Sequence, residues 1–177
     1  MKVQCFFCLL LILFASCRED IDKSQLEFYE GPMRIGHDIE LLHSDSAIVV
    51  IKLVAAKQLV FKNGDTQFPE GILINFYNKE GELSSTIRAD KGYHERRTNL
   101  YRGEGDVRVH NITKEQKLSS EELFWDPNKK IIYTDKFVTV EEPNRLIKGT
   151  GMEADEGFNE YRFDKPTGEI EGILERK

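Results

Sequence analysis

Residues 87–93 of this chain read IRADKGY, and the same pattern of residue types returns as LSSEELF at 118–124 and as MEADEGF at 152–158. Each copy runs apolar, polar, small, acidic, two variable positions and aromatic. Self-similarity at a period of 31 to 34 residues indicates one structural unit that stacks on itself. Such a stack builds an extended surface or groove, which favours binding along its length over a single catalytic pocket.

The side-chain alternation in this region is that of β-strands. Apolar residues fall two positions apart, as a strand requires, whereas a helical array of similar period needs spacings of three and four. Turn-forming residues separate these runs at 63–65, 78–81, 126–128 and 165–168. The alternation is clearest at Ile72, Ile74 and Phe76, at Leu83, Ile87 and Ala89, at Val107 and Val109, and at Val138 and Val140. We therefore predict an all-β fold of many short strands, a sandwich or a barrel.

The first 16 residues have the composition of a secretory signal. Lys2 supplies a positive start, residues 3–14 are almost wholly apolar, and two small residues precede Cys17. The apolar run is well short of the roughly 20 residues that span a bilayer as a helix. The ending FASC at 14–17 resembles the lipobox of bacterial lipoproteins, in which the cysteine becomes the lipidated first residue. We predict a lipoprotein signal peptide at 1–16 and lipidation of Cys17; an uncleaved anchor is the alternative.

The rest of the chain divides into two parts. Residues 17–43 are polar and weakly periodic, which is typical of a tether, either a disordered spacer or one that ends in a short edge strand. Residues 44–177 suit one domain of ordinary size. Cys5 and Cys8 lie in the predicted signal peptide, so Cys17 is the only cysteine left and no intrachain disulfide is expected.

The sequence contains no recognisable catalytic, metal-binding or cofactor-binding motif. The four histidines are not spaced as metal ligands, and the GxG fragments at 103–105 and 149–151 lack the context of a dinucleotide fold. Asp90, Glu121 and Asp155 repeat with the scaffold, whereas a catalytic pair would be expected to break the repeat. A net charge of −6 argues against nucleic acid as a partner. We predict no enzymatic activity, no catalytic residue, no metal and no cofactor.

Five stretches together resemble the LptC family, the membrane-tethered periplasmic component of lipopolysaccharide export. The resemblance covers about residues 44–170. The stretches are GILINFY at 71–77, LFWDP at 123–127, IYTDKFV at 132–138, IKGTGMEAD at 147–155 and PTGEI at 166–170.

This resemblance implies a twisted, open β-jellyroll of the OstA-like type, in which two facing sheets enclose an apolar trough for the acyl chains of lipopolysaccharide. The N-terminal end is expected to meet an inner-membrane ABC transporter, and the C-terminal end an LptA-like periplasmic protein, edge strand to edge strand. The best-known members are held by a transmembrane helix. This chain is expected to use a lipid on Cys17 instead, on the periplasmic side of the inner membrane of a Gram-negative cell.

The predicted sites follow from the alternation of apolar residues and from the resemblance to the LptC family. The lipid-binding trough is assigned to Ile72, Ile74, Phe76, Leu83, Ile87, Val107, Val109, Leu118, Val138, Val140 and Met152. The partner docking edge is assigned to Glu169, Ile170, Glu171, Gly172, Ile173 and Leu174. Trp125 is expected to anchor the packing of the sheets. A carbohydrate-binding β-sandwich lipoprotein is the alternative function, and it would need exposed aromatic platforms on one face.

Overall fold

The computed structural model of the chain describes residues 29–171, with side chains as far as Gly168. The predicted signal peptide, Cys17 and residues 172–174 of the predicted docking edge lie outside the described residues. From Gly31 onward the chain forms one compact unit. Its described part contains eleven β-strands and no helix, which confirms the predicted all-β fold.

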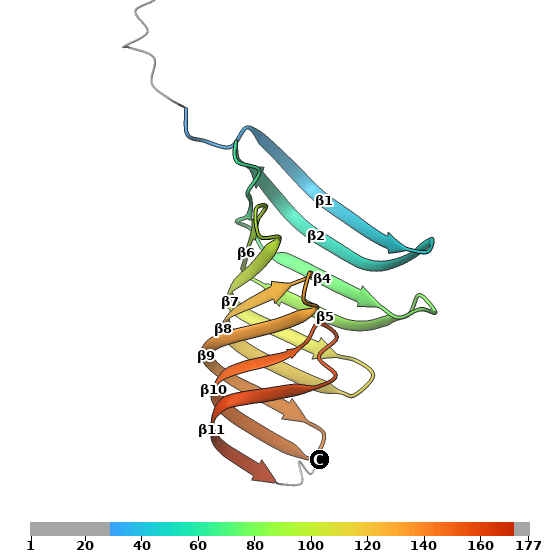
Figure 1. Cartoon of the computed structure of the whole chain (residues 1–177), viewed down its shortest axis with the longest axis vertical. Helices are drawn as coiled ribbons and strands as arrows, with labels where there is room; N and C mark the ends of the chain where they lie inside the picture. Colours follow the sequence, from blue (N-terminus) through green and yellow to red (C-terminus); the bar gives the residue numbers. More distant parts are fainter. Residues whose placement is uncertain (1–28, 172–177) are drawn as a thin grey trace, which may run out of the picture. The chain divides into compact units, whose positions relative to one another are not determined.

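The eleven strands are antiparallel to their neighbours and form a single sheet (Figure 1). They are β1 (Arg34–Asp45), β2 (Ile48–Val60), β3 (Thr66–Phe68), β4 (Ile72–Tyr77), β5 (Leu83–Ala89), β6 (Lys91–Glu95), β7 (Leu100–Asn111), β8 (Gln116–Asp126), β9 (Ile131–Glu142), β10 (Arg145–Asp155) and β11 (Tyr161–Glu171).

Two layers arise because the long strands take part in both. The second half of β7 pairs with β5, while its first half pairs with β6. In the same way β2 pairs with β4 through residues 51–54 and with β3 through residues 59–60. One continuous sheet therefore folds over on itself. We call the layer that contains β4 and β5 the first layer, and the layer that contains β3 and β6 the second layer.

The strands bend where the sheet passes from one layer to the other. In β7 the register shifts between Glu104 and Val107, and the two residues between them, Gly105 and Asp106, have φ angles of 76° and 40°. Strand β10 bends at Gly151, with φ of 74°. Bulges of this kind increase local twist and turn a strand. The sequence predicted many short strands. Strands β3 to β6 are short, as predicted, whereas the other seven strands have 11 to 13 residues, because a bulge such as that in β7 interrupts the alternation without ending the strand.

The sheet begins earlier than the sequence predicted. Strand β1 starts at Arg34, ten residues before the predicted domain start at Ser44, and pairs with β2 from Arg34–Val60 to Asp45–Ile48. Ten of the twelve side chains of β1 are exposed, and its apolar residues Ile35, Ile39, Leu41 and Leu42 do not alternate regularly along the strand. Residues 34–43, assigned to the tether from the sequence, are therefore part of this strand, which is held by backbone pairing to β2.

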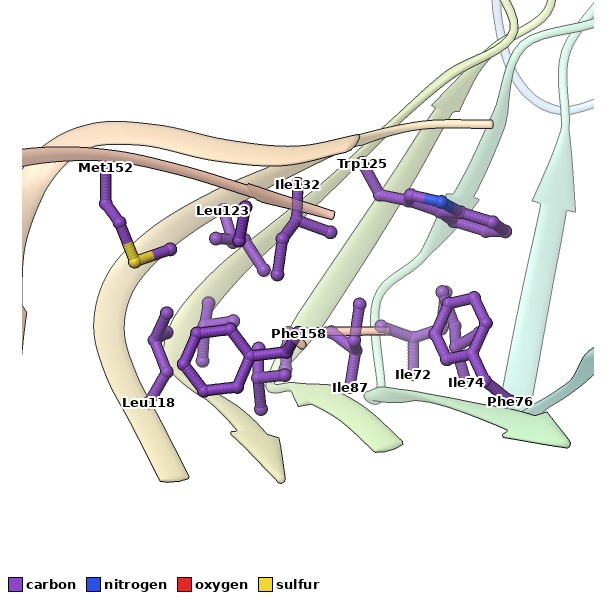
Figure 2. Packing of buried hydrophobic residues seen from close by; sticks show 14 of the residues in the cluster. Ile72, Ile74, Phe76, Ile87, Leu118, Leu123, Trp125, Ile132, Met152 and Phe158 are labelled. Atoms are coloured by element: carbon purple, nitrogen blue, oxygen red, sulfur yellow. The ribbon is translucent and has the colours of Figure 1, made fainter. Parts of the chain in front are cut away.

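The core lies between the two layers. Nineteen buried apolar residues form one cluster, with Ile51, Tyr101, Tyr161 and Phe163 packed against it. Figure 2 shows the cluster as two facing sets of side chains: Ile72, Ile74, Phe76, Ile87 and Leu118 on the first layer, and Leu123, Trp125, Ile132 and Met152 on the second. This interlayer space is where the resemblance places the trough.

Candidate functional site: the space between the two layers

An unbroken apolar row crosses the first layer from strand to strand. Neighbours in this row are register partners in the sheet, and all but the last are buried. Side chains opposite each other on adjacent strands lie close enough to touch. In strand order from β2 to β10, this apolar row consists of Leu53, Ile74, Ile87, Val109, Leu118, Val140 and Ile147.

The second layer faces this row with a row rich in aromatic residues. Tyr101, Trp125, Ile132, Ala154 and Tyr161 are successive register partners from β7 to β11. The centre of the Trp125 ring lies 4.8 Å from the centre of the Tyr101 ring. It lies 5.3 Å from the centre of the Phe76 ring of the first layer, which it meets edge-on. Trp125 therefore joins the two layers, as expected for a packing anchor.

Ten of the eleven predicted trough residues belong to the buried cluster. They are at most 7% exposed, and they come from six different strands. In this structure they pack against protein atoms, so their contact with lipid stays a prediction. The ten are Ile72, Ile74, Phe76, Ile87, Val107, Val109, Leu118, Val138, Val140 and Met152.

Leu83 is the exception, with 39% of its surface exposed. The register of β4 and β5 shifts next to Tyr77, so that Phe76 pairs with Ser85 but Tyr77 pairs with Leu83. Ser84 is the extra residue of this bulge. Leu83 consequently aligns with Tyr77, which alternates away from the buried Phe76, and the inward position of the trough is taken by Ser85. Leu83 therefore lies outside the buried cluster, because the regular alternation seen in the sequence does not continue through the bulge; its contact with lipid stays a prediction.

The third copy of the repeat is out of phase with the first two. Ile87 and Leu118 precede a bend and lie in the apolar row, whereas Met152 follows the bend at Gly151 and lies in the second layer, opposite Thr134. The aromatic positions differ as well. Tyr93 and Phe124 are half-buried residues within strands, whereas Phe158 lies in a turn and is fully buried.

The turn that carries Phe158 joins β10 to β11 and is built around one carboxylate. Asp155 accepts hydrogen bonds from the backbone N–H groups of Gly157 at 3.1 Å, Asn159 at 2.7 Å and Glu160 at 2.6 Å. The Phe158 N–H donates to the Asp155 carbonyl at 2.9 Å. These bonds fix the turn locally. The Phe158 ring points into the cluster between the two layers (Figure 2).

The same turn is also tied to the first layer. Asn111, at the end of β7, donates from its side-chain amide to the carbonyls of Gly157 at 3.0 Å and Phe158 at 3.1 Å. The Lys114 ammonium donates to the Asn159 carbonyl at 2.5 Å. The turn therefore bridges the two layers. We call residues 156–160 the bridging turn. The sequence identified Phe158 as the aromatic position of the third repeat copy, but it did not predict that this ring points inward or that the turn is bonded to Asn111.

A second bridge is made by Tyr161 and Glu142. The Tyr161 hydroxyl of the second layer donates to the Glu142 carboxylate of the first layer at 2.6 Å. Glu142 also accepts from Arg145 at 2.5 Å and from Gln116 at 2.8 Å. The Arg145 guanidinium holds the pKa of Glu142 below its usual range against the opposing effect of burial. Burial, together with the Glu142 hydrogen bond, raises the pKa of Tyr161. Near neutral pH the pair is thus a carboxylate and a neutral phenol.

A polar row runs beside the apolar row, two residues away from it on each of the strands β5, β7, β8 and β9. Ser85 pairs with Asn111, Asn111 pairs with Gln116, and the Gln116 amide reaches Glu142. Ser85 and Asn111 are 0% and 2% exposed. We call Ser85, Asn111, Gln116 and Glu142 the polar row. The interior therefore has an apolar floor with a polar border on the side of the bridging turn.

A cavity of about 240 Å³ opens into the space between the layers at the β1–β2 end. Its apolar wall includes Leu41, Ile51 and Leu53 from the first layer, and Tyr101 and Trp125 from the second. Burial raises the pKa of Tyr101. The interior is thus open to solvent at the end where the sheet begins.

Comparison with known families agrees with this geometry. A family model described as lipopolysaccharide-assembly, LptC-related, matches residues 36–160. The chain belongs to the LptC-related family. Membership of this family places the chain in lipopolysaccharide transport, and the jellyroll described above is the fold expected of it. A search of curated proteins found no match to the chain.

The LptC-related domain has an edge strand at each end of its strand order. Among the described residues β1 pairs only with β2, and β11 pairs only with β10. Glu169, Ile170 and Glu171 of the predicted docking edge lie in β11. Edge strands carry unpaired backbone groups, which are templates for strand addition. Pro166 also lies in β11 and supplies no N–H, so pairing along this edge is interrupted at that point.

The described part of the LptC-related chain has few features of other functions. Between residues 29 and 171 the structure holds no group of three or more metal-ligating side chains. No helix in that range is long and apolar enough to cross a membrane. Asp90 pairs with Arg88 at the bend of the sheet, and Asp155 builds the bridging turn, so these two of the three repeated acids have structural roles.

Proposed function

We propose that this domain carries lipopolysaccharide by holding its acyl chains between the two layers, without catalysing a reaction. The apolar row supports the proposal, because it continues through seven strands and begins at the open cavity beside the β1–β2 hairpin. Burying acyl chains yields roughly 0.8 kcal/mol per methylene. Hydrophobic contact is also non-directional, so a chain can slide along the row.

The two edge strands define the direction of transfer in this proposal. The β1 end receives lipopolysaccharide from an inner-membrane ABC transporter, and the β11 end passes it to an LptA-like periplasmic protein. Main-chain pairing at both ends would extend the layers beyond the domain. A lipid on Cys17 holds the chain at the membrane surface. The domain thus bridges the transporter and the next carrier.

Site-specific photo-crosslinking tests the carrier role. A photoreactive phenylalanine analogue replaces Tyr101, which lines the open cavity, and a second variant carries it at Ile74 of the apolar row. Both are expected to capture lipopolysaccharide in cells that export it. The control position is Thr86, which alternates away from the interior between Ser85 and Ile87. Equal capture at Thr86, or none at Tyr101 and Ile74, would contradict the proposal.

Two further experiments test the anchor and the docking edge. Cys17→Ala is expected to abolish palmitate labelling, whereas Cys5→Ala, inside the predicted signal peptide, keeps it; continued labelling of the Cys17 variant would overturn lipidation there. Deletion of residues 169–177 is expected to weaken binding to an LptA-like protein, and deletion of residues 175–177 serves as its control. Unchanged binding after the longer deletion would place the docking surface elsewhere.

A further inference from the structure

Two buried polar atoms in the polar row have no hydrogen-bond partner among the described residues. They are the Ser85 hydroxyl oxygen and the Gln116 side-chain carbonyl oxygen. An unpaired buried polar group is costly, and native interiors contain few of them. Ser85 and Gln116 flank Asn111 on its two neighbouring strands. The unpaired atoms therefore belong to one short rung of the sheet.

The centre of this rung is occupied by the chain itself. Asn111 donates to two backbone carbonyls of the bridging turn, and Phe158 of that turn fills the adjoining apolar space. The bridging turn thus places an aromatic ring on the apolar side of the rung and two carbonyl oxygens on the Asn111 amide. An acyl chain with its linking carbonyl likewise places an apolar group next to a hydrogen-bond acceptor.

We propose that Ser85, Asn111 and Gln116 form a binding site for the amide link of an N-acylated glycolipid, and that the bridging turn occupies this site until lipid displaces it. The link's carbonyl accepts from the Asn111 amide and the Ser85 hydroxyl. Its N–H donates to the unpaired Gln116 oxygen. The attached chain takes the space of Phe158 beside the apolar row. The inference rests on the proposed carrier function and specifies which part of the lipid the polar row recognises.

The bridging turn is held by polar contacts at its surface and by the fully buried Phe158 ring, and in the exchange the incoming acyl chain takes the space of that ring. Asn159 and Glu160 are exposed, and the tie to the first layer consists of the Asn111 and Lys114 hydrogen bonds. An incoming amide link replaces the carbonyls that leave Asn111, so the donor stays paired. It also supplies the two partners that the rung lacks.

Two single-chain probes separate recognition of the amide from burial of the chain. N-dodecanoyl glucosamine carries an amide link, and dodecyl glucoside has a chain of the same length on an ether oxygen. Binding to the mature, full-length protein is followed by the fluorescence of Trp125, the only tryptophan, which lines the cavity between the layers. The wild-type protein is expected to bind the amide probe more tightly.

Ser85→Ala is the deciding variant. Its hydroxyl has no partner in the free protein, so the variant is expected to fold with unchanged or increased stability. Loss of one hydrogen bond to the amide probe raises its Kd about three- to tenfold, whereas the Kd of the ether probe stays the same. Ser119→Ala is the matched control, a half-buried serine of the same layer that alternates with the inward Leu118. It is expected to leave both Kd values unchanged.

Each other outcome contradicts a different claim. Equal affinity of the wild-type protein for the two probes, or equal effects of Ser85→Ala on both, overturns the amide site while leaving the carrier function intact. A clear loss of stability in Ser85→Ala shows that the hydroxyl is paired in the free protein and overturns the premise. Failure of the wild-type protein to bind either probe contradicts the carrier function itself, and the amide site with it.

Discussion

Asn111 and Phe158, 47 residues apart in the sequence, are joined by a hydrogen bond of 3.1 Å from the Asn111 amide to the Phe158 carbonyl. Asn111 ends a strand of the first layer, and Phe158 lies in the turn that leaves the second layer. The bond therefore connects the two layers of the sheet at the polar border of the interior. The bond also holds Phe158 in place. Of the three aromatic repeat positions, Tyr93, Phe124 and Phe158, only Phe158 points into the core.

Phe158→Ala tests how much the bridging turn contributes to stability. Its ring is fully buried in the cluster, so the substitution is expected to lower the free energy of unfolding by about 3–5 kcal/mol. Chemical denaturation measures the loss. Phe137→Ala is the control, because that ring is 53% exposed, and its effect is expected to stay within about 0.5 kcal/mol. Similar losses in the two variants would show that Phe158 does not pack as described.

Asp155→Ala tests the construction of the turn. Three backbone N–H groups lose a charged acceptor, and hydrogen bonds to charged groups are worth roughly 1.5–3 kcal/mol. Hydrogen exchange of the amides of residues 157–160 is expected to accelerate strongly while exchange in β7 and β8 changes little. Asp135→Ala, which removes a carboxylate that is 79% exposed, controls for the change in charge. Unaltered protection of the turn would contradict the role of Asp155.

Glu142 makes the stability of the domain depend on pH. Its pKa in the folded state is lowered by the Arg145 hydrogen bond, opposed by burial and assisted by the Tyr161 and Gln116 hydrogen bonds. The stabilisation by the Glu142 carboxylate is therefore present above the pKa that Glu142 has in the unfolded chain. It is lost as the pH falls through the pKa of Glu142 in the folded state.

The measurement is the unfolding free energy between about pH 6 and pH 3 for the wild-type protein and Glu142→Gln. The variant is expected to lose less stability over this range, because its amide does not titrate. Glu141→Gln, an exposed neighbour, is expected to follow the wild type. A Glu142→Gln curve parallel to that of the wild type would contradict the prediction.

Gly105→Ala tests the bend of β7. Gly105 has a φ of 76°, which costs other residues about 1–2 kcal/mol, and an added Cβ would lie 3.2 Å from the Asp90 side chain. The variant is expected to lose at least this amount of unfolding free energy, and it therefore unfolds at a lower denaturant concentration. Gly168→Ala is the control, since no atom lies within 4 Å of its added Cβ. Equal tolerance at both positions would show that the bend does not need glycine.

Much of the fold could be predicted because it follows from local patterns. The alternation at 72–76 and at 107–109 identified strands whose inward residues are buried, and ten of eleven predicted trough residues lie in the core. The exposure of Leu83 could not be predicted, because the bulge at Ser84 depends on pairing with β4. The sequence left open whether residues 17–43 end in a short edge strand. Strand β1 is an edge strand, and it starts as early as Arg34 because backbone pairing with β2 holds it.

The candidate site divides in the same way. The strand content, the period of the repeat, the scarcity of catalytic motifs and the resemblance to LptC-related proteins could all be recognised from the amino-acid sequence, since each is a property of nearby residues. Tertiary structure decided which layer each copy of the repeat enters, that Phe158 points inward, and that Ser85, Asn111 and Gln116 share a rung. Those features depend on register between strands and on the bends that fold one sheet into two layers. Both are set by contacts between residues far apart in the chain.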